Sequence, residues 1–206
     1  MTPTSNDGES GDDRSAPDGA DDAGRTDDPL TWETVDSRVA YDCPGFEVHS
    51  QTVELPDGTE TDFDYLSEPP AVVVLALTVD GRAVVIEEWR QAVGRVNRGL
   101  PAGTVEPDDA DLVATAHREL REETGYEADA VEHLVTVEPA NGCTDAVHHC
   151  FLATGCTPTA EQSLDADESI RVDTTPLSTL RSAVASGSIR DGRAVTAVGY
   201  HALREQ

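Results

Sequence analysis

Alternating apolar and polar residues predict a series of short strands in the first half of the chain. Turn residues bound each of five stretches, at 33–41, 46–55, 60–66, 71–79 and 82–90. The fourth stretch reads AVVVLALTV, and a continuous apolar run indicates a strand buried on both faces. Asp80-Gly81 follows it and predicts a hairpin to the fifth stretch. We expect most aromatic side chains of the first three strands, including Phe46 and Phe63, to belong to the core.

The second half of the chain mixes helical and strand patterns. A polar loop is predicted at 91–98 and a helix within 103–126. Further strands are predicted at 131–137, 147–153 and 169–172, and further helices at 176–185 and 191–204. Strands outnumber helices and helices flank them, so the sequence predicts an α/β fold class with mixed sheets in layers.

Residues 1–29 contain almost no large apolar side chain and are rich in Asp, Gly, Ser and Thr. Such a segment cannot bury enough surface to offset the entropy of ordering it. We therefore expect a disordered acidic tail at 1–29, followed by one folded domain at 30–206.

The stretch 103–126 carries the strongest chemical signal. Read as a helix, it places Glu119, Glu122 and Glu123 on one narrow face, and Gly125 is placed to end it. Like charges at this spacing repel, and they lie in the last turn, where the helix dipole favours cations. Carboxylate oxygens suit Mg²⁺ or Mn²⁺, which would reverse the repulsion. Spacing alone leaves two interpretations open, a metal site and a solvated acidic face.

The same stretch resembles the Nudix box, a pattern of Gly-x5-Glu-x7-Arg-Glu-apolar-x-Glu-Glu-x-Gly-apolar. The residues that match by type are Gly103, Arg118, Glu119, Leu120, Glu122, Glu123, Gly125 and Tyr126. The spacing from Gly103 to Arg118 is one residue longer than the pattern, and Asp109 stands where the first Glu is expected. The resemblance favours the metal site over the solvated face.

Flanking segments extend the resemblance to the ADP-ribose pyrophosphatase branch of the Nudix hydrolases, over about residues 30–204. They are 53–58, Arg90 with 92–94, 100–103 and 187–191, and Gly99 departs from the Glu usual in that branch. The resemblance implies an α/β/α sandwich preceded by N-terminal antiparallel strands. It also implies a homodimer in which these strands help to form the partner's site.

The resemblance assigns the residues around the expected metal. Glu119, Glu123 and Glu122 are expected to bind Mg²⁺ or Mn²⁺, and the backbone carbonyl of Ala102 to add a ligand. Arg118 is expected to orient a glutamate; a surface ion pair is the alternative. Such a site hydrolyses a diphosphate by positioning and electrostatics.

Further residues are candidates for substrate binding. Arg90 resembles a substrate-binding Arg of the branch, and Arg95 and Arg98 offer cationic contacts, with charge balancing as their alternative role. Trp32 is a candidate stacking surface. Histidines 117, 148 and 149 are expected to be structural or solvated.

The loop 139–146 corresponds to one that often carries a catalytic Glu in this branch. Asp145 is the nearest acid, although a shifted alignment would place Ala146 there. Asp145 is therefore either a group that activates the attacking water or a residue that supports the turn, with Glu122 as the next candidate base.

Composition restricts the setting of this chemistry. Acids outnumber bases 41 to 14, all bases are Arg, and the net charge is −27. An acidic, Lys-free chain resembles proteins adapted to high salt, and it argues against binding to nucleic acid or anionic membranes. The sequence shows no apolar run of membrane-spanning length, no signal-peptide pattern and no zinc-ligand spacing of its cysteines. We expect a cytoplasmic protein.

The leading hypothesis is an enzyme that hydrolyses ADP-ribose, a small-molecule nucleoside diphosphate sugar, to AMP and ribose 5-phosphate. One alternative is a Nudix hydrolase of another nucleoside diphosphate derivative, such as a GDP-sugar or a dinucleotide. The other is a non-catalytic Nudix-like ligand sensor.

Overall fold

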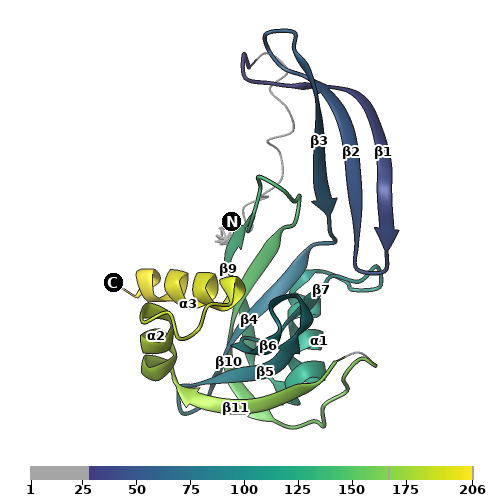
Figure 1. Ribbon diagram of the computed structural model, residues 1–206. Helices are drawn as coiled ribbons and strands as arrows, with labels where there is room; N and C mark the ends of the chain where they lie inside the picture. Colours follow the sequence, from purple (N-terminus) through teal and green to yellow (C-terminus); the bar gives the residue numbers. More distant parts are fainter. Residues whose placement is uncertain (1–27, 167, 206) are drawn as a thin grey trace, which may run out of the picture.

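The computed structural model describes residues 28–166 and 168–205. The predicted acidic tail lies outside the described residues apart from Asp28 and Pro29. Three antiparallel strands, β1 (Glu33–Cys43), β2 (Phe46–Glu54) and β3 (Glu60–Ser67), form a sheet that stands apart from the main body (Figure 1). The three N-terminal strands predicted from the alternation are confirmed.

The aromatic side chains of this small sheet are more exposed than the sequence led us to expect. Phe46 and Phe63 are exposed, so their assignment to the core is wrong. Trp32, just before β1, is 48% exposed and packs edge-to-face against Phe63, with ring centroids 6.1 Å apart. Among the described residues, no helix or second sheet covers these strands, and alternation alone does not reveal whether a strand has a covering layer.

The main sheet contains the other strands in the order β11-β5-β4-β10-β8, with β6 beside β5, β7 beside β4 and β9 beside β10. Their bounds are β4 (Ala71–Thr78), β5 (Arg82–Arg90), β6 (Arg95–Gly99), β7 (Ala102–Thr104), β8 (Tyr126–Glu127), β9 (Ala130–Val137), β10 (His148–Pro158) and β11 (Ile170–Pro176). Strands β4 and β10 are parallel, and the other pairs are antiparallel.

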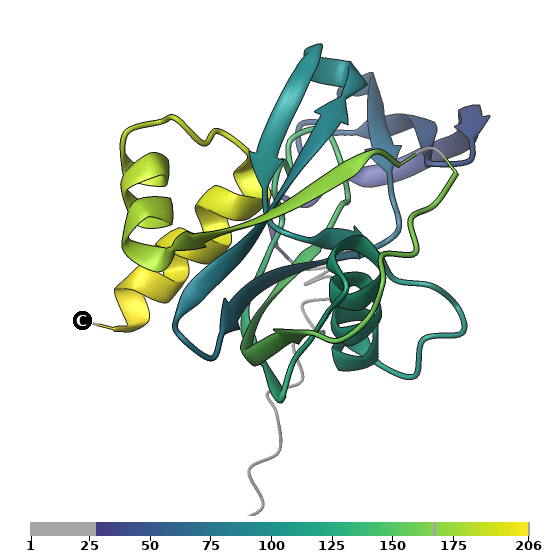
Figure 2. The same cartoon turned by 90° about the horizontal axis from the view of Figure 1, so that it is seen from below.

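Helices cover both faces of this sheet. Figure 2 shows α1 (Leu112–Thr124) on one side and α2 (Leu177–Ala185) with α3 (Gly192–Arg204) on the other. Each side has its own buried cluster: Val74 and Leu120 belong to the α1 side, and Leu75 and Val198 to the α2–α3 side. The side chains of β4 alternate between the two clusters, which explains its continuous apolar run. The mixed α/β fold and its sandwich of layers are confirmed.

The structure corrects the boundaries of several elements. The predicted loop 91–98 is instead a 3-10 turn, Gln91–Val93, followed by β6, which pairs with β5 along its length. Strand β11 extends to Pro176, beyond the predicted 169–172, because β5 pairs with it through Arg82. Strands β7 and β8 are too short to give a periodic signal. None of the helices in the described part of the chain is long and apolar enough to cross a membrane.

The small sheet is joined to the main body near the predicted site. Leu66, at the end of β3, forms a parallel bridge with Thr144 in the loop before β10. The amide of Leu66 donates to the carbonyl of Cys143, and the amide of Asp145 donates to the carbonyl of Leu66. This connection fixes where the chain leaves β3 and enters β4.

Candidate active site

Helix α1 carries the box carboxylates, and local signals fix both of its ends. Asp111 caps the first turn by accepting a 2.8 Å hydrogen bond from the amide of Ala114. Gly125 ends the helix at φ 73°, and its amide donates to the carbonyl of Arg121. A Cβ on Gly125 would lie 2.4 Å from the carbonyl oxygen of Ala160, so only glycine fits. The predicted helix end is confirmed.

The short strand β7 lies directly on the helix. The amide of Ala102 donates a buried 2.9 Å hydrogen bond to Oε2 of Glu123. A Cβ on Gly103 would lie 2.1 Å from the carboxyl carbon of Glu119, so the box glycine is needed for this close approach. The carboxylates of Glu119 and Glu123 thus lie against the backbone of the 100–103 segment.

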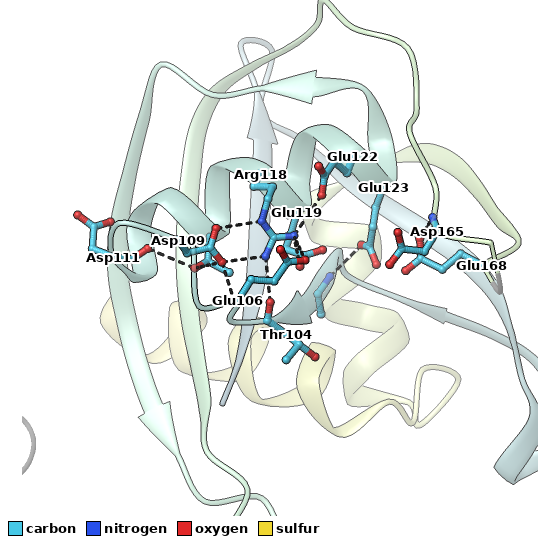
Figure 3. Close-up of polar contacts among 12 residues, drawn as sticks. Thr104, Glu106, Asp109, Asp111, Arg118, Glu119, Glu122, Glu123, Asp165 and Glu168 are labelled. Atoms are coloured by element: carbon cyan, nitrogen blue, oxygen red, sulfur yellow. Dashed lines mark hydrogen bonds and ion pairs between the residues drawn. The ribbon is translucent and has the colours of Figure 1, made fainter. Parts of the chain in front are cut away.

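Arg118 is the hub of the acidic cluster (Figure 3). It binds both oxygens of Asp109 at 3.0 and 2.9 Å, Glu119 at 2.8 Å and Glu122 at 3.1 Å, and it donates to the carbonyl of Thr104. The hydrogen bonds from Arg118 hold the pKa of Asp109 well below its usual range. Asp109, in the slot of the first box acid, therefore anchors Arg118, and Arg118 orients two of the glutamates.

Two of the carboxylates are buried. Glu123 is 2% exposed and Glu119 is 8% exposed. Burial raises the pKa of Glu123 to about 8 although the Ala102 amide opposes it, and burial raises the pKa of Glu119 to about 7 against the attraction of Arg118. The negative charge of Glu168 adds to both shifts. The acidic cluster therefore holds more negative charge than the Arg118 guanidinium compensates.

A cavity of about 460 Å³ opens beside these carboxylates. Arg90 and Arg193 lie in its wall, together with His148. Arg90 forms a 2.7 Å ion pair with Glu88. Burial raises the pKa of Glu88 above its ordinary value, although the charges of Arg90 and Arg193 oppose this shift. Acidic and basic groups thus share one cavity, as the recognition of a phosphate ester together with a cation requires.

The segment between β10 and β11 adds two acids to the cavity. Figure 3 shows Asp165 and Glu168 near Glu123, on the side away from Arg118. The amide of Asp165 donates to Oε2 of Glu168 at 3.0 Å, which orients the Glu168 carboxylate. The half-buried Glu168 is therefore well placed to act on a ligand in the cavity.

The donor set fits a divalent cation. Hard cations prefer carboxylate oxygens, and Glu119 and Glu123 supply them without enough counter-charge. Within the described residues, no three side chains of His, Cys, Asp or Glu are already gathered as a metal site. Arg118 binds Glu119 and Glu122, and the Ala102 amide binds Glu123, so cation binding would exchange some of these hydrogen bonds for metal ligation.

The structure brings most of the predicted site residues together. The cavity lining includes Arg90, Ala102, Arg118, Glu119, Glu122 and Glu123.

Four of the predicted residues lie elsewhere. Trp32 is on the small sheet, Arg95 contacts Asn97 on β6, and Arg98 pairs with Asp173 at 3.4 Å. Asp145 accepts hydrogen bonds from the Ser67 hydroxyl and the Glu68 amide, at 2.7 and 3.0 Å. These contacts join the loop before β10 to the end of β3 and are not hydrogen bonds within the loop's own turn.

Other residues reach the cavity that the sequence did not suggest as site residues. Those with a charged or imidazole side chain are Glu68, Glu106, His148, Asp165, Glu168 and Arg193. His148 was expected to be structural or solvated. Arg193 lies two residues after the 187–191 motif, and this position was the signal that could have identified it. The acids come from segments without periodicity, so their position depends on tertiary folding.

Comparisons with known proteins agree with this geometry. The NUDIX domain family matches residues 67–190. The ADP-ribose pyrophosphatase of Bacillus subtilis (strain 168) is 31% identical over 177 residues, 85% of this chain and 95% of that protein. The methanol dehydrogenase activator of Bacillus methanolicus is 32% identical over 154 residues, 74% of this chain and 83% of that protein.

A solved structure supports the fold alone. A crystal structure of an ADP compounds hydrolase superposes with a TM-score of 0.73 at 20% identity, covering 84% of this chain and 92% of that one. The family match and the relatives together show that the protein is a hydrolase. The chain belongs to the Nudix hydrolase family, and the resemblance to its ADP-ribose pyrophosphatases is confirmed.

The buried carboxylates predict an unusual stability profile for Glu123→Gln. The pKa of Glu123 is raised from 4.5 to about 8, so the stability that Glu123 contributes is fully present below 4.5 and is lost as pH rises through 8. Without metal, Glu123→Gln should melt above the wild type, by a margin that grows from about pH 5 to about pH 8 and then levels off. Thermal melting in EDTA at constant salt measures this margin.

Glu122→Gln is the matched control, because the side chain of Glu122 is 42% exposed. Its melting temperature should stay close to that of the wild type, as expected for a surface ion pair. A Glu123→Gln margin that is absent, or that does not change with pH, would contradict the burial of an ionisable Glu123.

Proposed function

We propose that this protein hydrolyses the pyrophosphate bond of a nucleoside diphosphate sugar, ADP-ribose, giving AMP and ribose 5-phosphate with Mg²⁺ or Mn²⁺. The observation that carries the proposal is the pair of buried, undercompensated carboxylates in a cavity that also contains Arg90 and Arg193 besides Arg118. The two relatives named as ADP-ribose pyrophosphatases, from Bacillus subtilis and Mycobacterium tuberculosis (strain ATCC 25618 / H37Rv), support ADP-ribose as the substrate.

The residues of α1 would hold the cation. Glu119 and Glu123 are its proposed ligands, with Glu122 and the Ala102 carbonyl beside them. A divalent cation there neutralises diphosphate charge and lowers the pKa of a coordinated water. Arg118 keeps Glu119 and Glu122 oriented through its hydrogen bonds. Asp109 in turn holds Arg118, which fixes the acidic wall before a ligand arrives.

The arginines would bind the diphosphate itself. Arg90 lies in the cavity wall with its guanidinium 2.7 Å from Glu88, which fixes its direction. Arg193, at the start of α3, is within 3.9 Å of Asp191 and faces the same cavity. Guanidinium groups pair well with phosphate oxygens. Arg95 and Arg98 keep the charge-balancing role in this proposal.

We place the general base on Glu168. It is one of the two acids that reach the cavity on the side away from Arg118, and its charge acts on both Glu119 and Glu123. From there Glu168 would take a proton from the attacking water. Asp145 remains the second candidate, although its carboxylate is occupied by Ser67 and Glu68.

Substituting the two candidate bases in turn should have opposite effects on kcat. Glu168→Gln should lower kcat by a factor of about 10²–10⁴ with little change in KM, the usual range for lost general-base catalysis. Asp145→Asn should keep kcat within about threefold and lower the melting temperature, since it weakens hydrogen bonds to Ser67 and Glu68. Steady-state kinetics at saturating Mg²⁺ decide between them. The reverse result would move the base to Asp145.

A substrate panel tests the activity itself. The wild type, in high KCl with Mg²⁺, should convert ADP-ribose to AMP and ribose 5-phosphate faster than a GDP-sugar or a dinucleotide, with products identified by mass. Glu123→Gln and added EDTA should each remove at least about 99% of turnover, because both remove the cation. Faster turnover of another diphosphate would change the substrate, and absence of any turnover would favour a ligand sensor.

The homodimer and the high-salt setting are also part of the proposal, as is the cytoplasmic location expected from the sequence. The small sheet exposes Trp32, Val39, Tyr41, Phe46 and Phe63, a surface suited to a second copy of the chain. In such a dimer, Trp32 would serve the partner's cavity as a stacking surface. The net charge of −27 needs screening, so salt should stabilise the fold.

Light scattering and thermal melting across KCl concentrations test both points together. We expect the mass of a dimer and a melting temperature that rises with salt. Phe63→Asp should give monomers, because it places a charge on the apolar surface, whereas Asp62→Asn on the same strand should not. A monomeric wild type would contradict the proposed homodimer. A melting temperature that does not change with salt would contradict the high-salt setting.

A further inference from the structure

The chain entering β10 presents two residues to the active-site cavity. Ala146 and His148 both line it, whereas His149 is hydrogen-bonded to Thr136 of β9, at 3.0 Å. Successive side chains of a strand point to opposite faces, so two adjacent histidines have separate environments. His148 belongs to the cavity, and His149 belongs to the interface with β9.

The ring of His148 is half-buried and has no hydrogen-bond partner among the described residues, unlike that of His149. Burial, and then the positive charge of Arg193, lower the pKa of His148 below its ordinary value. The ring is therefore neutral at neutral pH, with one nitrogen as donor and the other as acceptor. A half-buried polar group without a partner beside a cavity is free to bind a ligand.

Glu68 lies beside the same end of the cavity. Glu68 lines the cavity together with His148, and its negative charge partly opposes the lowering of the His148 pKa. The Asp145 carboxylate holds the amide of Glu68 at 3.0 Å, and the Thr144 hydroxyl contacts the Glu68 carboxylate at 3.4 Å. The predicted loop at 139–146 thus positions Glu68 at the cavity edge.

The strand order of the sheet sets the distance between His148 and the carboxylates of α1. Ala71 of β4 is in register with His148 of β10 on one side and with Thr104 of β7 on the other. Two strand spacings separate His148 from Thr104, about 9–10 Å. Thr104 accepts from Arg118 and follows Gly103, which lies on Glu119. A group at His148 is therefore displaced from the carboxylates by a span that a diphosphate ester can bridge.

The chemistry of the pair differs from that of the arginines. Guanidinium groups only donate, which suits phosphate oxygens, whereas a carboxylate accepts and a neutral imidazole does both. Sugar hydroxyls also donate and accept. Glu68 and His148 together thus complement adjacent hydroxyls of a sugar, and Ala146 leaves space beside them.

We propose that Glu68 and His148 form a subsite for the hydroxyls of the sugar attached to the diphosphate, and that His148 is a specificity-determining residue of this protein. The inference rests on the proposed hydrolysis of nucleoside diphosphate sugars and names the residues that recognise the sugar. Asp145 acts in it as a positioning residue, through Glu68.

The test compares ADP-ribose with ADP methyl ester, which keeps the diphosphate and lacks the sugar. His148→Ala should lower kcat/KM for ADP-ribose about 10- to 100-fold, mainly through KM, as expected when a hydrogen-bonding group is lost. For ADP methyl ester the same variant should change kcat/KM less than about threefold. His148→Gln, which keeps a donor and an acceptor, should recover part of the loss.

His149→Ala is the matched control, because it removes the same side chain from the other face of the strand. It should leave kcat/KM for both substrates within about threefold of the wild type. Glu68→Gln changes an exposed residue and so keeps the test open if His148→Ala fails to fold. It should lower kcat/KM for ADP-ribose about tenfold and leave the methyl ester unaffected.

The outcomes separate this inference from the function on which it rests. A wild type that hydrolyses neither compound overturns the proposed function and the subsite with it. With an active wild type, an unchanged His148→Ala or Glu68→Gln overturns the subsite alone. Equal losses on both compounds also overturn it, because His148 then contacts the diphosphate and not the sugar.

Discussion

The hydrogen bond between the Ala102 amide and the Glu123 carboxylate, with Gly103 seated on Glu119, is the contact on which the site depends. It brings the backbone of β7 onto the last turns of α1 and removes two carboxylates from water. Because β7 also pairs with β4, the central strand of the sandwich fixes the position of both acids. A side chain at Gly103 would displace the carboxylate of Glu119 from this position.

Burying these two acids costs free energy, and the contacts in the fold offset only part of that cost. Arg118 could neutralise one carboxylate, yet it is bound on one side by both oxygens of Asp109. The remaining negative charge lies at the cavity, where a cation would relieve it. The arrangement that leaves these acids undercompensated is therefore the one that would favour a bound cation.

Much of the fold was predictable from local patterns. Helix α1 and its end at Gly125 follow from helical spacing and a glycine that no other residue replaces, and β4 follows from an apolar run buried on both faces. Strand β6 was missed because its arginines resemble a polar loop until β5 is placed beside it. Phe46 and Phe63 were misplaced because alternation does not reveal whether anything covers a sheet.

The site was predictable where one helix carries it and obscure where tertiary pairing assembles it. Glu119, Glu122 and Glu123 share a helix face, so their spacing alone brought them together. Glu168 arrives from the connection between β10 and β11, and His148 from the strand parallel to β4. No periodicity in the chain shows either position, because each depends on the register of strands that are distant in sequence.

That parallel pairing of β4 with β10 has a consequence for how the protein is made. Strand β4 and the box helix leave the ribosome well before β10, which must pair beside β4 to complete the sheet. Contacts between distant segments form late in folding, since loop closure precedes them. The nascent chain therefore carries the acids of α1 before it has the cavity wall formed by His148. Successive side chains of β10 point to opposite faces of the sheet. A slip of one residue against β4 would therefore turn His149 toward the cavity in place of His148.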